Sequence, residues 1–120
     1  MKERVVQNIS YQFAVNIILV YKELVQQSGY IFAKQIVRSG TSIGAMIREA
    51  DHAESKPDFR HKLAIAQKET SETLYWLELL NETGYLGKAN FQKLHIEALS
   101  IMKLLTKIIK TSKLRSSAVK

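Results

Sequence analysis

The chain has 120 residues, of which 46% are hydrophobic and 24% are charged, and this is the size and composition of one globular domain. It contains no cysteine, which excludes disulfide bonds and any metal site or nucleophile that depends on a thiolate. The formal net charge is +7, and residues 101–120 carry six basic side chains and no acidic one, so most of the excess positive charge lies at the C-terminal end.

The first predicted element is an amphipathic helix over residues 6–24, where apolar side chains recur every three or four positions. Its most apolar part, residues 13–20, is interrupted by Asn16 and is shorter than the roughly 20 residues that cross a bilayer. Charged residues precede it as in a secretory signal, but polar residues dilute the region and no small-residue cleavage site follows. We therefore expect a cytoplasmic protein without a membrane partner.

The second predicted helix spans residues 32–53 and follows a break at Ser28-Gly29. It is unusual because it contains Gly40 and Gly44, and each glycine costs roughly 1 kcal/mol relative to alanine inside a helix. The two glycines lie on one helical face, which predicts that a neighbouring helix packs closely against them. The alternative is a functional backbone surface for a ligand or RNA.

The third predicted helix covers residues 59–80. Ser55 precedes it and is expected to accept a hydrogen bond from a backbone N–H of the first turn. Near its C-terminal end, Tyr75, Trp76 and Leu79 make the apolar face wider than a monomeric bundle needs. We predict that these three residues form a subunit interface; single exposed aromatic side chains on a monomer are the alternative.

The fourth predicted helix covers residues 91–108 and follows a turn in which Gly84 suits the left-handed conformation that ends a helix. Basic side chains continue along its end into a tail: Lys103, Lys107, Lys110, Lys113 and Arg115. Such a basic segment favours polyanions such as RNA, and we predict that these five residues bind nucleic acid. The alternative is a solvated helix end whose cations complement the helix dipole.

Four helical stripes joined by short connections predict an all-α fold, an antiparallel up-down four-helix bundle. We expect residues 1–112 to form this single domain and residues 113–120 to form a basic C-terminal tail.

Sequence motifs typical of metal, catalytic or phosphate-binding sites are weak or lacking in this chain. Glu49-x-x-His52 matches once a motif that di-iron bundles need twice, and the chain has neither a nucleophile elbow nor a phosphate-binding loop. We therefore expect no enzyme, no catalytic residue, no metal and no cofactor. We expect the glutamates to form ion pairs across neighbouring faces instead: Glu49, Glu69 and Glu72 with Arg38, Arg48 or Lys62.

An ordered series of small-residue and acidic motifs runs through the middle of the chain: Arg38-Ser39-Gly40-Thr41-Ser42-Ile43-Gly44-Ala45, Ile47-x-Glu49-Ala50, Ala53-Glu54-Ser55-Lys56-x-Asp58-Phe59, Lys62-Leu63-x-Ile65-Ala66, Glu69, Glu72-Thr73-x-Tyr75-Trp76-Leu77-x-Leu79-Leu80 and Glu82-Thr83-Gly84-Tyr85-Leu86. Over residues 30–112 this series resembles the 23S rRNA intervening-sequence proteins, also called S23 ribosomal-type proteins. Met46 departs from the family pattern, which usually has Asn there.

The resemblance implies a four-helix bundle that forms homo-oligomers, with a pentameric ring as the expected state, and it brings no catalytic residues. A related branch comprises the accessory variability proteins of diversity-generating retroelements, which bind nucleic acid and a reverse transcriptase. We therefore expect a non-enzymatic accessory protein that is associated with 23S rRNA intervening sequences and binds RNA or other nucleic acid through its basic surface. The alternative is a protein-interaction scaffold that recruits a partner such as a reverse transcriptase, without a direct nucleic-acid role.

Overall fold

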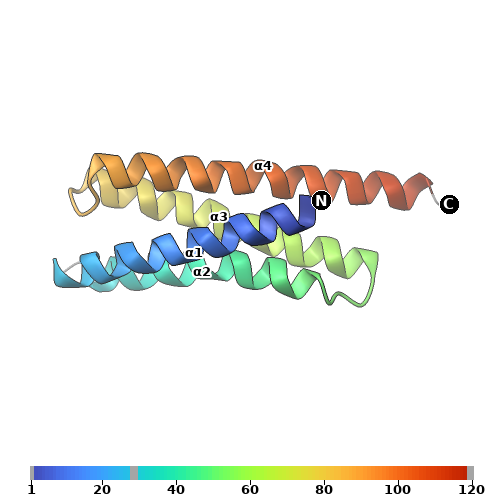
Figure 1. Ribbon diagram of the computed structural model, residues 1–120, viewed down its shortest axis with the longest axis horizontal. Helices are drawn as coiled ribbons and strands as arrows, with labels where there is room; N and C mark the ends of the chain where they lie inside the picture. Colours follow the sequence, from blue (N-terminus) through green and yellow to red (C-terminus); the bar gives the residue numbers. More distant parts are fainter. Residues whose placement is uncertain (1, 28–29, 119–120) are drawn as a thin grey trace.

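The computed structural model describes residues 2–27 and 30–118, which form four α-helices. The helices are α1 (Lys2–Gln26), α2 (Tyr30–Ala50), α3 (Lys56–Glu82) and α4 (Lys88–Ala118). They lie side by side in a rod of 55 × 22 × 19 Å, with the α2–α3 loop at one end and the α3–α4 loop at the other (Figure 1). No strand occurs in the described ranges, and this confirms the predicted all-α fold. The predicted break at Ser28-Gly29 lies outside the described residues.

One hydrophobic core is shared by all four helices, and the predicted stripes supply most of it. Its large, fully buried side chains include Phe13 and Ile17 of α1, Ile36 and Ile43 of α2, Leu63 and Leu77 of α3, and Ile101 and Leu105 of α4. At the start of α2, Ala33 is buried and contributes to the core, whereas Phe32 is 37% exposed. Met46, the position that departs from the family pattern, packs against the edge of this core and is partly buried.

The two glycines of α2 face α1. A β-carbon built on Gly40 would lie 2.9 Å from Cγ2 of Ile17, whereas one built on Gly44 would lie 3.5 Å from the carbonyl oxygen of Ser10. The first distance is shorter than two carbon atoms tolerate, and the second is an ordinary van der Waals contact. Gly40 is therefore the residue that lets α1 and α2 approach this closely.

Hydroxyl groups inside the bundle are paired. Ser39 and Thr73 lie on facing sides of α2 and α3, with 2.9 Å between Oγ and Oγ1. Thr70 donates to the carbonyl oxygen of Ala66, and Ser10 donates to that of Gln7. No buried side-chain nitrogen or oxygen in the described part of the chain lacks a hydrogen-bond partner.

The ends of α3 have the predicted chemistry. Ser55 accepts a hydrogen bond from the backbone N–H of Asp58 at 3.1 Å and so caps the first turn. At the other end, Gly84 has a φ of 86°, and Tyr85 N–H donates back to the carbonyl oxygen of Leu80 at 3.0 Å. This is the glycine-dependent C-cap that the sequence predicts.

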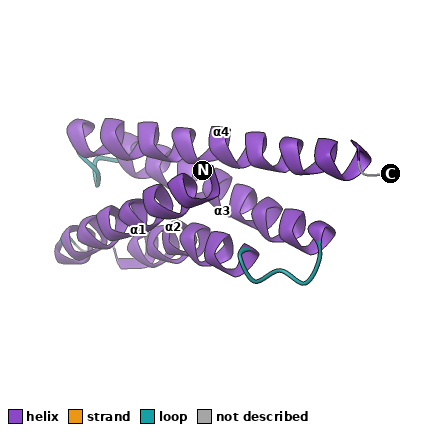
Figure 2. Cartoon of the chain, turned by 45° about the vertical axis from the view of Figure 1, so that its right-hand side comes forward, coloured by secondary structure: helices purple, strands orange, loops and turns teal. Residues whose placement is uncertain are grey.

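The C-terminal end of α4 extends past the α2–α3 loop, as Figure 1 and Figure 2 both show. The described part of the expected tail, residues 113–118, continues α4 as helix, and residues 119–120 lie outside the described residues. None of the helices described here combines the length and the hydropathy that crossing a bilayer requires.

Candidate nucleic-acid interface

The outer face of α4 carries a row of exposed cations. Lys103, Lys107 and Lys110 are spaced so that they share one side of the helix, opposite the buried side chains of Ile101, Leu105 and Ile108. At 1.5 Å of rise per residue, the row extends over about 10 Å of the helix axis. The other two predicted binding residues, Lys113 and Arg115, are also exposed but fall on opposite flanks of α4.

The structure therefore divides the predicted group of five. Lys103, Lys107 and Lys110 form a continuous row, which we call the α4 lysine row. Lys113 and Arg115 stand to either side of its end.

The charge of the α4 lysine row is not neutralised within the described residues. The ion pairs found there join Arg38 to Glu69 and Glu72 and Lys62 to Glu49, and the His95 ring lies 3.1 Å from the Glu78 carboxylate. No acidic residue follows Glu97 in the sequence, so the second half of α4 supplies no carboxylate of its own. A row of unneutralised ammonium groups attracts phosphate through Coulomb forces that salt screens.

A side chain from α3 holds the end of α4 in place. Arg60 Nη1 donates to Ser112 Oγ at 3.1 Å and to Ser116 Oγ at 2.9 Å, and it lies 3.4 Å from the Ser112 carbonyl oxygen. The guanidinium thus ties two successive turns of α4 to the start of α3. The sequence does not reveal this contact, because residues 60 and 116 belong to different helices and no motif links them.

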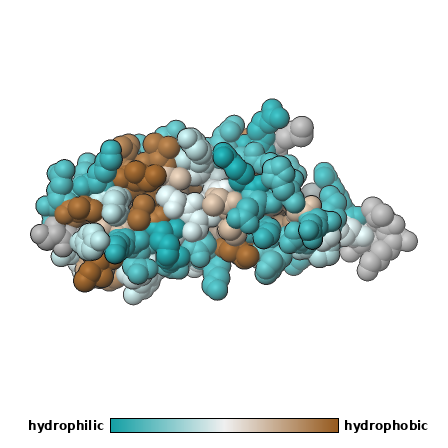
Figure 3. All heavy atoms as spheres, turned by 90° about the horizontal axis from the view of Figure 1, so that it is seen from below, coloured by the Kyte–Doolittle hydropathy of each residue, from teal (hydrophilic) through white to brown (hydrophobic). Residues whose placement is uncertain are grey.

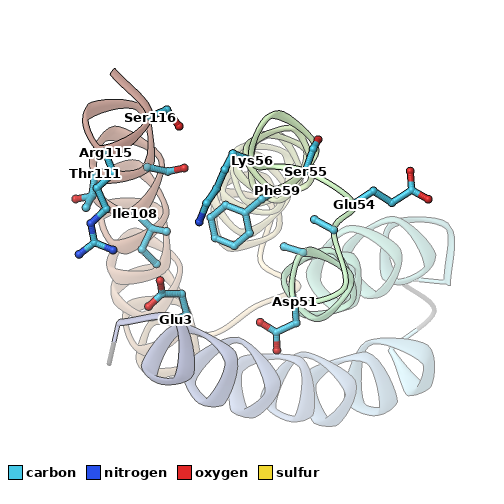
Figure 4. A pocket seen from close by; sticks show the side chains of 13 residues that line it. Glu3, Asp51, Glu54, Ser55, Lys56, Phe59, Ile108, Thr111, Arg115 and Ser116 are labelled. Atoms are coloured by element: carbon cyan, nitrogen blue, oxygen red, sulfur yellow. The ribbon is translucent and has the colours of Figure 1, made fainter. Parts of the chain in front are cut away.

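A cavity of about 1210 Å³ opens at the same end of the bundle, between the start of α1, the α2–α3 loop and the end of α4. In Figure 4, Phe59 points into this opening, with Arg115 and Glu3 on one side of its ring and Asp51 below it. Glu54 and Lys56 also line it. Because its charged groups are of both signs, the cavity does not suit a polyanion as well as the α4 lysine row does.

The face formed by α2 and α3 carries a charged cluster around the single tryptophan. Arg38 forms ion pairs with Glu69, at 3.2 Å, and with Glu72. Trp76 Nε1 donates to Glu72 Oε2 at 3.0 Å. These two hydrogen bonds, first that of Trp76 and then that of Arg38, lower the pKa of Glu72 below its ordinary value. The ion pairs of Arg38 with both glutamates confirm an expectation drawn from the sequence.

The three residues predicted to form a subunit interface differ in exposure. Tyr75 is 57% exposed, whereas Trp76 and Leu79 are half-buried and Trp76 already packs against the core. The Tyr75 ring meets the indole edge-to-face, with 5.1 Å between ring centroids. Tyr75 is thus the residue of the three that projects furthest from the bundle.

A second apolar surface, which sequence analysis missed, lies between α1 and α2. Tyr11, Ala14 and Ile18 of α1 line a groove of about 530 Å³ together with Gly44 and Ala45 of α2. The close approach of the two helices at Gly40 could be predicted from the paired glycines in the sequence. The groove could not, because it depends on side chains of α1 that lie outside the buried face of that helix. Exposed apolar side chains also gather in the half of the molecule that contains the end of α1 and the start of α2 (Figure 3).

The weak metal motif does not form a site. Glu49 pairs with Lys62 at 3.4 Å, as expected, and His52 lies in the turn that follows α2. Within residues 2–27 and 30–118, no three His, Asp or Glu side chains are grouped so that they could hold a metal ion.

Comparison with known proteins gives one family and a close structural match. The family model described as 23S rRNA-intervening sequence protein matches residues 2–107. A crystal structure of a protein with unknown function from the S23 ribosomal protein family of Bacteroides thetaiotaomicron is 50% identical to this chain. The match covers 92% of this chain and 99% of that one, with a TM-score of 0.89. No curated protein matches the sequence.

Proposed function

Because the chain belongs to the 23S rRNA-intervening sequence protein family, we propose that it is a non-enzymatic, oligomeric accessory protein that acts in the cytoplasm and binds RNA. Association with 23S rRNA intervening sequences is part of this proposal. The observation that carries RNA binding is the α4 lysine row, which is exposed, lies along one helical face and has no described carboxylate paired with it.

Contacts from this row to phosphate oxygens would position the protein on RNA without reading bases. Each phosphate contact displaces condensed counterions, so the affinity falls as the salt concentration rises. Lys113 and Arg115 add positive charge at the end of the same helix, which strengthens the attraction without extending the row.

The proposed working unit is an antiparallel up-down bundle assembled as a homo-oligomer, with a pentamer as the expected form. Short loops between long neighbouring helices support the antiparallel order. Exposed Tyr75 and the apolar side chains near the end of α1 and the start of α2 support self-association, because a monomer gains nothing from leaving them in water.

The direct test measures RNA binding at several salt concentrations. We expect weaker binding by a variant that lacks the row, Lys103→Gln/Lys107→Gln/Lys110→Gln, and unchanged binding by a control of equal charge, Lys22→Gln/Lys68→Gln/Lys93→Gln. All six lysines are exposed, so neither variant disturbs the core. Equal binding by both variants would contradict the proposal. Truncation after Thr106 is less informative, because it also removes buried Ile108.

The second candidate is a scaffold that recruits a protein such as a reverse transcriptase, as the accessory variability proteins do. The α1–α2 groove favours it, because apolar grooves on helical proteins accept helices of partners. A complex that survives nuclease treatment and high salt, and does not form with Ile18→Glu, would support this function over RNA binding.

A further inference from the structure

We infer that the α4 lysine row binds double-helical RNA in preference to single-stranded RNA. This inference rests on the proposed function and names the form of RNA that the same surface recognises. It follows from what the face presents: a fixed line of charge and no phenylalanine, tyrosine or tryptophan on which a base can stack.

Single-stranded nucleic acids are held by basic grooves lined with aromatic side chains, on which the unstacked bases lie. The α4 lysine row offers no such platform. Phe91 is the last phenylalanine, tyrosine or tryptophan in the sequence, and it lies about three turns before Lys103, partly buried against the core and the His95 ring. The aromatic pair Tyr75 and Trp76 belongs to α3.

The neighbours of the row on the same face are aliphatic or small. Ile96 and Leu99 precede it and Leu114 follows it, all of them exposed. Ser100 is exposed one turn before Lys103 and offers a hydroxyl that can donate or accept. Duplex RNA is recognised mainly through its shape, its phosphates and its 2′-hydroxyl groups. The three ammonium groups and the Ser100 hydroxyl match these features, whereas the bases of a single strand would find no aromatic side chain along the row. The hydroxyl of Thr106 is exposed as well but is already engaged, because it donates to the carbonyl oxygen of Met102 and accepts from Gln67 Nε2.

The row is also held rigid. Lys103, Lys107 and Lys110 stand on a helix of 31 residues whose inner side is anchored by Ile101, Leu105 and Ile108. Beyond them, Arg60 fixes the next two turns through Ser112 and Ser116. A duplex presents its phosphates at fixed spacing, so a rigid row can meet several of them at once. A flexible single strand must first be ordered, and that costs conformational entropy.

The experiment compares two RNA competitors of the same length and sequence, one single-stranded and one annealed to its complement, against a labelled duplex bound to the full-length protein. We expect the duplex to compete at a concentration about tenfold lower, because the single strand gains no stacking contact. Salt dependence is measured as the slope of the logarithm of the affinity for duplex against the logarithm of the salt concentration. We expect the Lys103→Gln/Lys107→Gln/Lys110→Gln variant to reduce the magnitude of this slope by about three, roughly one for each phosphate that a lysine of the row neutralises.

The outcomes separate this inference from the proposed function. Equal competition by the two forms, or stronger competition by the single strand, overturns the duplex preference and leaves RNA binding intact. Failure of both forms to bind at low salt overturns the proposed function itself. The control variant Lys22→Gln/Lys68→Gln/Lys93→Gln must keep the preference for the duplex. If this variant bound both forms of RNA equally, the preference would come from the net charge of the protein, and the role of the α4 lysine row would be overturned.

Discussion

The missing β-carbon of Gly40 on α2 leaves the space that Ile17 of α1 occupies: a β-carbon there would lie 2.9 Å from Ile17 Cγ2. Ile17 is fully buried and branched at its own β-carbon, so it has no room to move aside. One turn further along, Gly44 leaves 3.5 Å to the nearest atom of Ser10. Two glycines on the same helical face thus stand in different packing environments.

We expect alanine substitutions at these glycines to act in opposite directions. Gly40→Ala should lower the free energy of unfolding by about 1–2 kcal/mol, because overpacking outweighs the gain in helix propensity. Gly44→Ala should raise it by up to about 1 kcal/mol, because the added methyl group fits and the propensity gain remains. Urea denaturation of both variants measures the difference, and equal effects would contradict the packing argument. In an Ile17→Ala background, Gly40→Ala should no longer be destabilising.

The glycine face could be predicted from the sequence, but this asymmetry could not. Gly40 and Gly44 share a face by helical periodicity alone, and that is enough to expect a close neighbour. Which glycine is indispensable depends on where the α1 side chains fall along α2, and periodicity does not give the register between two helices. The same limit applies to Ser39 and Thr73: both lie within predicted helices, but their hydrogen bond depends on the register of α2 against α3.

The buried Ser39–Thr73 pair should show energetic coupling. Thr73→Val leaves the Ser39 hydroxyl without its partner and should cost about 1–2 kcal/mol of unfolding free energy. Ser39→Ala should cost less, because Thr73 Oγ1 also lies 2.8 Å from the carbonyl oxygen of Glu69. The double variant should cost clearly less than the sum of the two single variants. Urea denaturation of all four proteins measures this, and strictly additive effects would show that the two hydroxyls do not stabilise each other.

Glu72 should make stability depend on pH in the acidic range. The hydrogen bond from Trp76 and the ion pair with Arg38 lower the pKa of Glu72 in the folded state. The unfolded chain therefore binds a proton at this site more readily, and the stabilisation present above the ordinary glutamate pKa disappears as the pH falls through the lower, folded-state pKa. Glu72→Gln removes this contribution, so the difference in stability between wild type and variant should be greatest at neutral pH and should shrink on acidification.

Trp76 is the only tryptophan in the sequence, so its fluorescence follows unfolding at each pH directly. Glu78→Gln is the matched control, because that exposed carboxylate pairs with the His95 ring and lies away from Arg38 and Trp76. A stability difference between wild type and Glu72→Gln that stays constant from neutral pH to about pH 3 would contradict the argument.

Self-association should depend on the face that carries Tyr75. We expect light scattering to give a mass above that of the monomer at micromolar concentration, and Tyr75→Glu to lower this mass, because a charge would be buried at the interface. Tyr11→Glu is the comparison, since Tyr11 is exposed to a similar extent, 60% against 57%, but lies in the α1–α2 groove. A monomeric wild type would contradict the oligomer, and a fall in mass for Tyr11→Glu alone would assign the interface to the groove.

For the candidate site, the positive charge could be predicted from the sequence, whereas its arrangement needed the structure. The sequence predicts five of the six basic residues after position 100 as one binding group, and helical geometry places only Lys103, Lys107 and Lys110 on a common face. The end of α4 was expected to be a tail from residue 113, but the structure continues the helix to Ala118. Arg60, on α3, explains why those turns can stay folded beyond most of the bundle, and no local pattern in the sequence reveals a contact between positions so far apart.

Arg60 should therefore act on RNA binding through the order of α4. Ser112→Ala/Ser116→Ala removes its two hydroxyl acceptors but keeps its charge, so electrostatic attraction is unchanged. We expect faster hydrogen exchange of the backbone amides in the last two turns of α4, and RNA affinity about two- to threefold lower, because a frayed helix must be ordered again on binding. Arg60→Gln should show the same exchange and a further decrease in affinity from the missing charge. Unchanged exchange in the double serine variant would mean that these turns are held by other contacts. The rigid row would then be a property of α4 alone, with Arg60 contributing only its charge.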